Sequence, residues 1–261
     1  MGHEADVTPK PEGPLARYLR DSRDLSTSFL FALPLLLAYE VGIVLTDSDV
    51  VNGASALMRL LIGTLAPAGW GHAVFNGCVV IAVLWAVVRT NDQGKRLWRP
   101  GTYLVMTVES VIYAFLLLFL LVWVQSIPAQ AWLQDPATAR PPTLGRTLVE
   151  GLVLSFGAGV YEEIFFRLFL LGGIAWVLKS GFGLLKQPAT TYALFASAVI
   201  FSAFHHLSPH DPWRLDAFLL RTAGGVFLGS LYLRRGLGIA IWAHALYDVF
   251  IVIIQHVLRP A

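Results

Sequence analysis

The sequence predicts an all-α fold, a polytopic bundle of transmembrane helices. Hydrophobic residues make up 56% of the 261 residues and charged residues only 14%, and the mean hydropathy is +0.64. Average soluble domains carry about 25% charged residues, so this chain lacks the charge that a water-exposed surface needs. Several stretches also reach the roughly 20 apolar residues with which a helix crosses the hydrocarbon core of a bilayer.

Seven stretches are predicted to span the membrane. They are Ser26–Leu45, His72–Val88, Thr102–Val124, Thr147–Leu178, Thr190–His206, Ala217–Leu233 and Gly238–Leu258. The fourth is overlong and is interrupted by charges. The stretch Ala54–Leu65 is apolar but short and contains Arg59, which favours an interfacial or re-entrant helix. If it spans, the number of spans becomes eight.

The chain divides into a polar N-terminal tail, residues 1–24, and one transmembrane domain, residues 25–261. The tail lacks the apolar core of a signal peptide, and Arg17, Arg20 and Arg23 within it indicate a basic interfacial helix. The motifs that carry chemistry lie within about residues 145–258.

The distribution of Lys and Arg predicts that the N-terminus is cytoplasmic. Twelve of the 19 fall in the tail and in the alternate loops that share its side, and six fall on the other side. Cytoplasmic loops carry the excess of such residues. We therefore expect an integral membrane protein with its N-terminus inside and the lipid bilayer as its surroundings. The composition resembles that of bacterial proteins, so the expected location is a bacterial inner membrane.

Composition also excludes several function classes. A formal net charge of +2 gives no basic footprint, so no nucleic-acid partner is expected. The single cysteine, Cys78, excludes a disulfide framework and a thiolate metal cluster.

Ionisable side chains inside the predicted spans are the strongest functional signal. A charge at the bilayer centre costs about 2.5–3.5 kcal/mol, so such groups pair or face a protein-lined cavity. For the isolated residues Glu40 and Glu109, the favoured interpretation is hydrogen bonding between helices. The others are Glu162, Glu163, Arg167, His205, His206, His244 and Asp248.

Two adjacent glutamates make the fourth span unusual. Glu163 and Arg167 are four residues apart, so they share a helical face and can form an ion pair. Glu162 lies about 100° round the helix from that face, which leaves one carboxylate free for chemistry. A purely structural ion pair would need only one glutamate.

Histidines on two further spans complete a hydrolytic set. His205 lies near the end of one span, and His244 shares a helical face with Asp248 on another. A buried carboxylate beside a neutral imidazole can deprotonate water, and a second histidine can orient a donor towards an oxyanion. No Ser or Cys lies in a nucleophile motif, so the sequence favours hydrolysis by water.

The ordered motifs resemble the CAAX-processing and bacteriocin-processing protease family, also called Abi. That family is recognised by Glu-Glu-x-x-x-Arg, Phe-x-x-x-His and His-x-x-x-Asn/Asp. The matching segments here are Glu162–Arg167, Phe201–His205 and His244–Asp248. The resemblance covers about residues 145–258, while residues 1–140 match only as generic spans.

The resemblance implies an intramembrane glutamic endopeptidase that uses no cofactor or metal. Its substrate would be a membrane-anchored protein or peptide, cleaved at a C-terminal or CAAX-like tail. Glu162 and His205 would activate water, and His244 with position 248 would help the oxyanion site. Asp248 departs from the Asn of the best-known prenyl-protein endopeptidases, and an ionised Asp is an acceptor only.

The same resemblance assigns supporting roles to four other residues. Glu163 and Arg167 would form the structural pair, and Phe201 opens the second motif. His206 leaves open which of two adjacent imidazoles acts.

Two other functions stay open. The polar groups could instead hold zinc in a membrane metalloprotease, although the spacings match no standard zinc motif. A non-enzymatic transport or immunity protein is the second alternative; the polar groups crowd into the second half of the chain, which argues for one site. Spacing along the helices further predicts that the site opens to the non-cytoplasmic face, with residues 206–210 as its lip.

Overall fold

Every regular element of the described chain is a helix, as the sequence predicts. The computed structural model describes residues 13–46, 70–92, 99–126, 148–207 and 213–257, and these residues contain no strand. The candidate helix Ala54–Leu65 and most of the proposed lip, residues 208–210, lie outside the described residues.

All seven predicted spans are helical, with bounds that shift by a few residues at each end. The predicted spans correspond to α2 (Leu25–Thr46), α4 (Trp70–Asp92), α5 (Pro100–Gln125), the composite of α7 (Leu148–Glu163), η1 (Ile164–Leu171) and α8 (Gly172–Ser180), then α9 (Lys186–His205), α10 (Leu215–Arg235) and α11 (Leu237–Val257). By length and composition, three helices of the described chain could cross a membrane, namely α2 over Leu25–Ile43, α5 and α11.

The overlong fourth span is one unbroken helical path with a wider turn in its middle. The residues of η1 form a π-helix between two α-helical parts, in which hydrogen bonds join residues five apart. Such turns are rare and frequently mark functional sites. This one follows Glu163 directly and contains Arg167, so the geometry changes at the glutamate pair.

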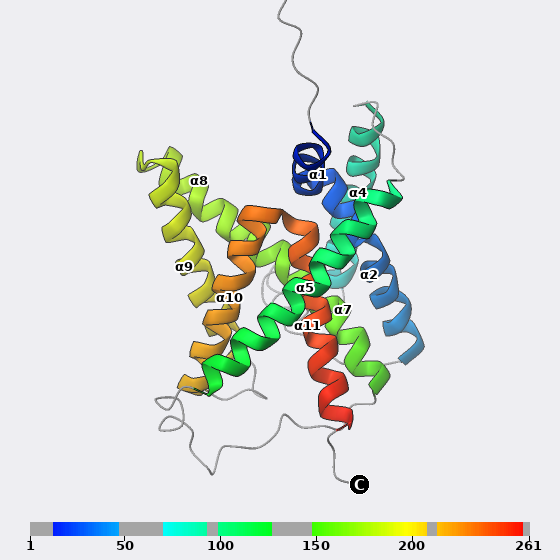
Figure 1. The fold of residues 1–261 in the computed structure, drawn as a ribbon, viewed down its shortest axis with the longest axis vertical. Helices are drawn as coiled ribbons and strands as arrows, with labels where there is room; N and C mark the ends of the chain where they lie inside the picture. Colours follow the sequence, from blue (N-terminus) through cyan, green and yellow to red (C-terminus); the bar gives the residue numbers. More distant parts are fainter. Residues whose placement is uncertain (1–12, 47–69, 93–98, 127–147, 208–212, 258–261) are drawn as a thin grey trace, which may run out of the picture.

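Helix α11 is the centre of the bundle. It packs against α7, α5, α2 and α10 (Figure 1), and Ile239, Ala240 and Ile241 in its first half are fully buried. The indole nitrogen of Trp242 donates to the carbonyl of Phe31 at 2.8 Å, which joins α11 to α2. Small side chains on α11 let its neighbours approach closely, as is usual in membrane bundles.

The outer surface of the long helices is apolar. Along α5, which crosses the bundle obliquely in Figure 1, Leu104, Phe119 and Trp123 are exposed, whereas Met106 and Leu117 on its other face are buried. A lipid environment accepts such side chains, so exposure and sequence together describe an integral membrane protein.

The N-terminal segment contributes a packed helix, α1 (Pro14–Arg23), where the sequence indicates a basic interfacial helix. It lies at the end of the bundle that also holds the start of α9 and the turn from α10 to α11 (Figure 1). Although the segment is polar, Asp21 and Ser22 are buried. Gly236 forms that turn with φ +92°, and a Cβ there would lie 2.9 Å from the Cα of Arg23, so glycine is required.

Candidate active site

The three motifs identified in the sequence meet inside the bundle. Glu162 and Glu163 end α7, Arg167 lies in η1, His205 is the last residue of α9, and His244 with Asp248 lies on α11. Their side chains form one cluster.

Glu162 faces two imidazoles from different helices. Its Oε2 atom lies 3.8 Å from Nε2 of His205 and 4.0 Å from Nε2 of His244. These distances are too long for direct hydrogen bonds. Glu162 is only 5% exposed, so a carboxylate and two ring nitrogens converge on a largely enclosed point.

The orientation of His205 is set by its own helix. Its Nδ1 atom lies 2.9 Å from the carbonyl oxygen of Phe201. A carbonyl only accepts hydrogen bonds, so Nδ1 carries the proton in the neutral ring. The lone pair of Nε2 is therefore directed at Glu162, and both facing groups are hydrogen-bond acceptors.

Glu163 is shared between a histidine and an arginine. Its Oε1 atom lies 2.8 Å from Nδ1 of His244, and its Oε2 atom lies 3.1 Å from Nε of Arg167. The i,i+4 spacing predicts the second contact but not the first. Both carboxylate and guanidinium are almost fully buried, so Glu163 is at once the counter-charge of Arg167 and the hydrogen-bond partner of His244.

Arg167 is held by charge and by an aromatic ring. Its guanidinium carbon lies 4.6 Å from the ring centre of Phe201, within the range of a cation–π contact. Among the described residues, neither of its terminal nitrogens has a hydrogen-bond partner. Phe201 thus connects two motifs, since its carbonyl also orients His205.

Asp248 lies on the other side of His244. Its Oδ2 atom is 3.6 Å from Nε2 of His244, as the shared helical face predicts. The side chain of Asp248 is 28% exposed and that of His205 is 23% exposed, whereas Glu163 is completely buried. The cluster is therefore most accessible on the side of Asp248 and His205.

His206 points elsewhere. Its ring lies 4.9 Å from that of Trp213 and 6.3 Å from that of Phe218, so it packs among aromatic side chains at the start of α10. Of the two adjacent histidines, His205 is the one near Glu162.

A glycine contact brings the cluster together, and sequence analysis missed it. A Cβ at Gly159 would lie 2.6 Å from Cβ and 2.8 Å from the backbone nitrogen of Ala245. Since Gly159 precedes Glu162 by one turn and Ala245 follows His244, this close approach of α7 to α11 sets the distance between the glutamates and the histidine. Small residues beside each motif were the available signal.

The two isolated glutamates lie outside the cluster and join helices. Tyr161 donates to Oε1 of Glu40 at 2.6 Å. Glu109 pairs with Arg235 and accepts a hydrogen bond from Tyr18 on α1. Both contacts agree with the expected role in joining helices.

Metal binding has no geometric support in the residues described. No group of three or more His, Cys, Asp or Glu side chains in that part of the chain is placed to hold a metal ion.

The fold and this cluster define a class, an integral membrane protein with buried carboxylates and imidazoles at one centre. Residues 144–250, which include the whole cluster, match the family model described as Type II CAAX prenyl endopeptidase Rce1-like. The match confirms the resemblance to the CAAX-processing family over these residues. No curated protein and no solved structure matches the chain.

Proposed function

We propose that this protein is a glutamic-type intramembrane endopeptidase whose general base is Glu162. One observation carries the proposal: the Oε2 atom of this buried carboxylate lies within 4.0 Å of the Nε2 atoms of His205 and His244. A buried carboxylate between two imidazoles is suited to moving a proton to and from water.

Water would be activated between Glu162 and His205. Both groups present acceptors across 3.8 Å, so a water molecule between them can donate one proton to each. Transfer of one proton to Glu162 leaves hydroxide, which attacks the carbonyl carbon of the scissile peptide. Glu162 then returns that proton to the leaving nitrogen, and the peptide bond breaks.

His244 would stabilise the oxyanion of the tetrahedral intermediate. Its Nδ1 atom contacts the buried carboxylate of Glu163 at 2.8 Å, which favours a proton on Nδ1 and, when the ring is charged, on Nε2 as well. An Nε2–H group can donate to the oxyanion. Asp248, 3.6 Å from Nε2, would orient the ring.

The substrate class follows from the family match and the enclosed site. We propose a membrane-anchored protein or peptide that is cleaved near its C-terminal tail. Trapping with the Glu162→Gln variant tests this, because the variant keeps the shape of the side chain but removes the base. We expect mass spectrometry of bound material to find intact C-terminal peptides, which the wild-type protein would release as fragments. Two results together would contradict the proposal. The first is that a His205→Ala/Glu162→Gln double variant binds the same peptides as well as Glu162→Gln does. The second is that the wild-type protein releases no fragments.

We also propose that the protein lies in a bacterial inner membrane with α1 on the cytoplasmic side. The cluster would then open to the other face, because His205, one of its two more exposed residues, ends α9, and α9 begins at the same end of the bundle as α1 (Figure 1). A Leu207→Cys variant in a Cys78→Ser background tests this with an impermeant thiol reagent. Labelling of intact cells is expected; labelling only after the cells are broken open would reverse the orientation.

A zinc-dependent mechanism is the alternative that chelation tests: Glu162, His205 and His244 are zinc-ligand types, although the described side chains are not placed to hold a metal ion. Activity that survives chelators but is lost in Glu162→Gln would support the glutamic mechanism. Loss with a chelator and recovery with zinc would instead support a metalloprotease.

A further inference from the structure

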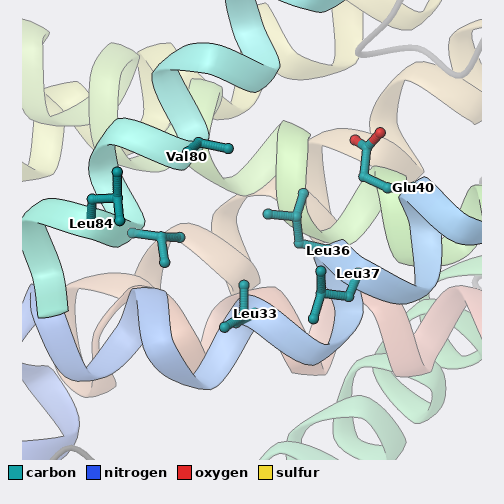
Figure 2. A pocket seen from close by; sticks show the side chains of 7 residues that line it. Leu33, Leu36, Leu37, Glu40, Val80 and Leu84 are labelled. Carbon is teal, nitrogen blue, oxygen red and sulfur yellow. The ribbon is translucent and has the colours of Figure 1, made fainter.

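A separate pocket lies between α2 and α4. Its volume is about 310 Å³. Six of the lining side chains are aliphatic and one is charged, with Glu40 at one end (Figure 2). The lining residues are Leu33, Leu36, Leu37, Glu40, Val80, Val83 and Leu84.

The pocket can be reached from the bilayer. Leu37, Val80 and Leu84 are 55%, 54% and 58% exposed, so their outer surfaces face the surroundings of the bundle. A hydrophobic molecule could therefore enter sideways, without passing through the catalytic cluster.

The polarity of the pocket changes along α2. Glu40 lies six residues before the last residue of α2, Thr46, which places it about 9 Å from that helix end. Leu33 lies seven residues in the other direction, about 10 Å deeper. This arrangement matches a membrane amphiphile, whose polar head lies near the interface and whose chain points towards the bilayer centre.

The Glu40 end of the pocket is held in position by α7, the helix that carries Glu162. Tyr161 on α7 is buried and donates to Oε1 of Glu40 at 2.6 Å, and Tyr39 packs edge-on against the Tyr161 ring at 5.1 Å. Tyr161 directly precedes Glu162 in the chain, so Glu40 is hydrogen-bonded to the residue next to the proposed general base.

We propose that this pocket binds a single-chain cationic amphiphile, with its aliphatic chain along Leu33, Leu37 and Leu84 and a protonated amine at Glu40. In a low-dielectric surrounding the carboxylate attracts an ammonium group strongly and repels an anionic head.

Photo-crosslinking in lipid nanodiscs tests the proposal without using peptidase activity. The probe is a dodecylamine that carries a diazirine on its chain. We expect saturable labelling of peptides from α2 and α4, with dodecylamine competing at least about tenfold better than dodecanol, as a charged hydrogen bond allows. Dodecanoate is expected to compete least.

Two variants with matched controls complete the test. Glu40→Gln should remove the advantage of the amine over the alcohol, whereas Glu150→Gln on α7 should keep it. Val80→Phe should fill the pocket and abolish labelling, whereas Ile81→Phe on the exposed face of α4 should leave it unchanged.

Three results would overturn the proposal. These are labelling spread evenly over the lipid-facing side chains of α5, equal competition by amine and carboxylate, and an amine preference that Glu40→Gln leaves intact. The outcome is independent of catalysis, because Glu162→Gln should bind the probe as the wild type does.

Discussion

The Oε1 atom of Glu163 lies 2.8 Å from Nδ1 of His244, and the two residues are 81 positions apart in the chain. This contact joins α7 to α11 at the centre of the bundle, and Arg167 balances the charge of the carboxylate from the other side. One glutamate of the pair is thus committed to holding a histidine and an arginine. Its neighbour Glu162 is left between the two imidazoles.

Removing Arg167 should destabilise the protein. Arg167→Ala leaves Glu163 buried without its cation, which is expected to cost about 3–5 kcal/mol in unfolding free energy. Thermal unfolding of purified protein measures this. Arg167→Met with Glu163→Gln should recover part of the loss, because neither position of the pair then holds a buried charge. Normal amounts of stable Arg167→Ala protein would show that the ion pair contributes little to the free energy of unfolding.

Gly159→Ala should separate the glutamates from His244. The added methyl group would lie 2.6 Å from Cβ of Ala245, so α7 and α11 must move apart. We expect the loss of turnover, expressed as an activation free energy, to exceed the loss of unfolding free energy. Gly173→Ala on α8 is the control, since a Cβ there meets nothing within 4 Å and the change should stabilise by about 0.5–1 kcal/mol. Equal behaviour of the two variants would contradict the close-contact argument.

The positions of the helices and the contacts within single helices were predictable from the sequence, each for its own physical reason. Apolar runs located the helices because the bilayer imposes a length of about 20 residues. The Glu163–Arg167 contact followed from the i,i+4 spacing within a helix. The same rule placed His244 beside Asp248.

Contacts between helices were not predictable in the same way. The Glu163–His244 contact depends on how α7 docks on α11, which Gly159 and Ala245 determine. Helix α1 was assigned to a polar tail because its composition is polar. Its packing depends on distant partners, since Asp21 accepts from Arg99 at 2.8 Å.

The contacts of Tyr18, Glu109 and Arg235 beside α1 lead to a prediction that concerns stability and not catalysis. Burial and the neighbouring carboxylate of Glu109 raise the pKa of Tyr18, so its hydroxyl stays protonated and donates to Glu109. Arg235→Ala should cost about 3–5 kcal/mol because Glu109 loses its cation, and Tyr18→Phe should cost about 1 kcal/mol. The pH profile of peptidase activity should be unchanged in Tyr18→Phe. A shifted profile would show that α1 acts on the reaction centre.

Two substitutions of Asp248 test whether this residue only orients His244. If it acts protonated or only orients His244, Asp248→Asn should retain substantial activity, because the amide can occupy the same place. Loss of the ionisable proton should also flatten the alkaline side of the pH–rate profile. Asp248→Ala should lose far more activity, since His244 then lacks its partner at 3.6 Å. Equal and complete loss in both variants would argue for a metal ligand.

The most direct test of the central claim follows the oxygen of water into the product. Wild-type protein and Glu162→Gln are compared in proteoliposomes made with ¹⁸O-labelled water, using a peptide captured by the variant as substrate and Glu150→Gln as control. We predict one labelled oxygen in the new C-terminal carboxylate for the wild type and for Glu150→Gln. Glu162→Gln should lose at least about 100-fold in rate at an unchanged melting temperature. Cleavage by Glu162→Gln at the wild-type rate would contradict the assignment of Glu162 as the base.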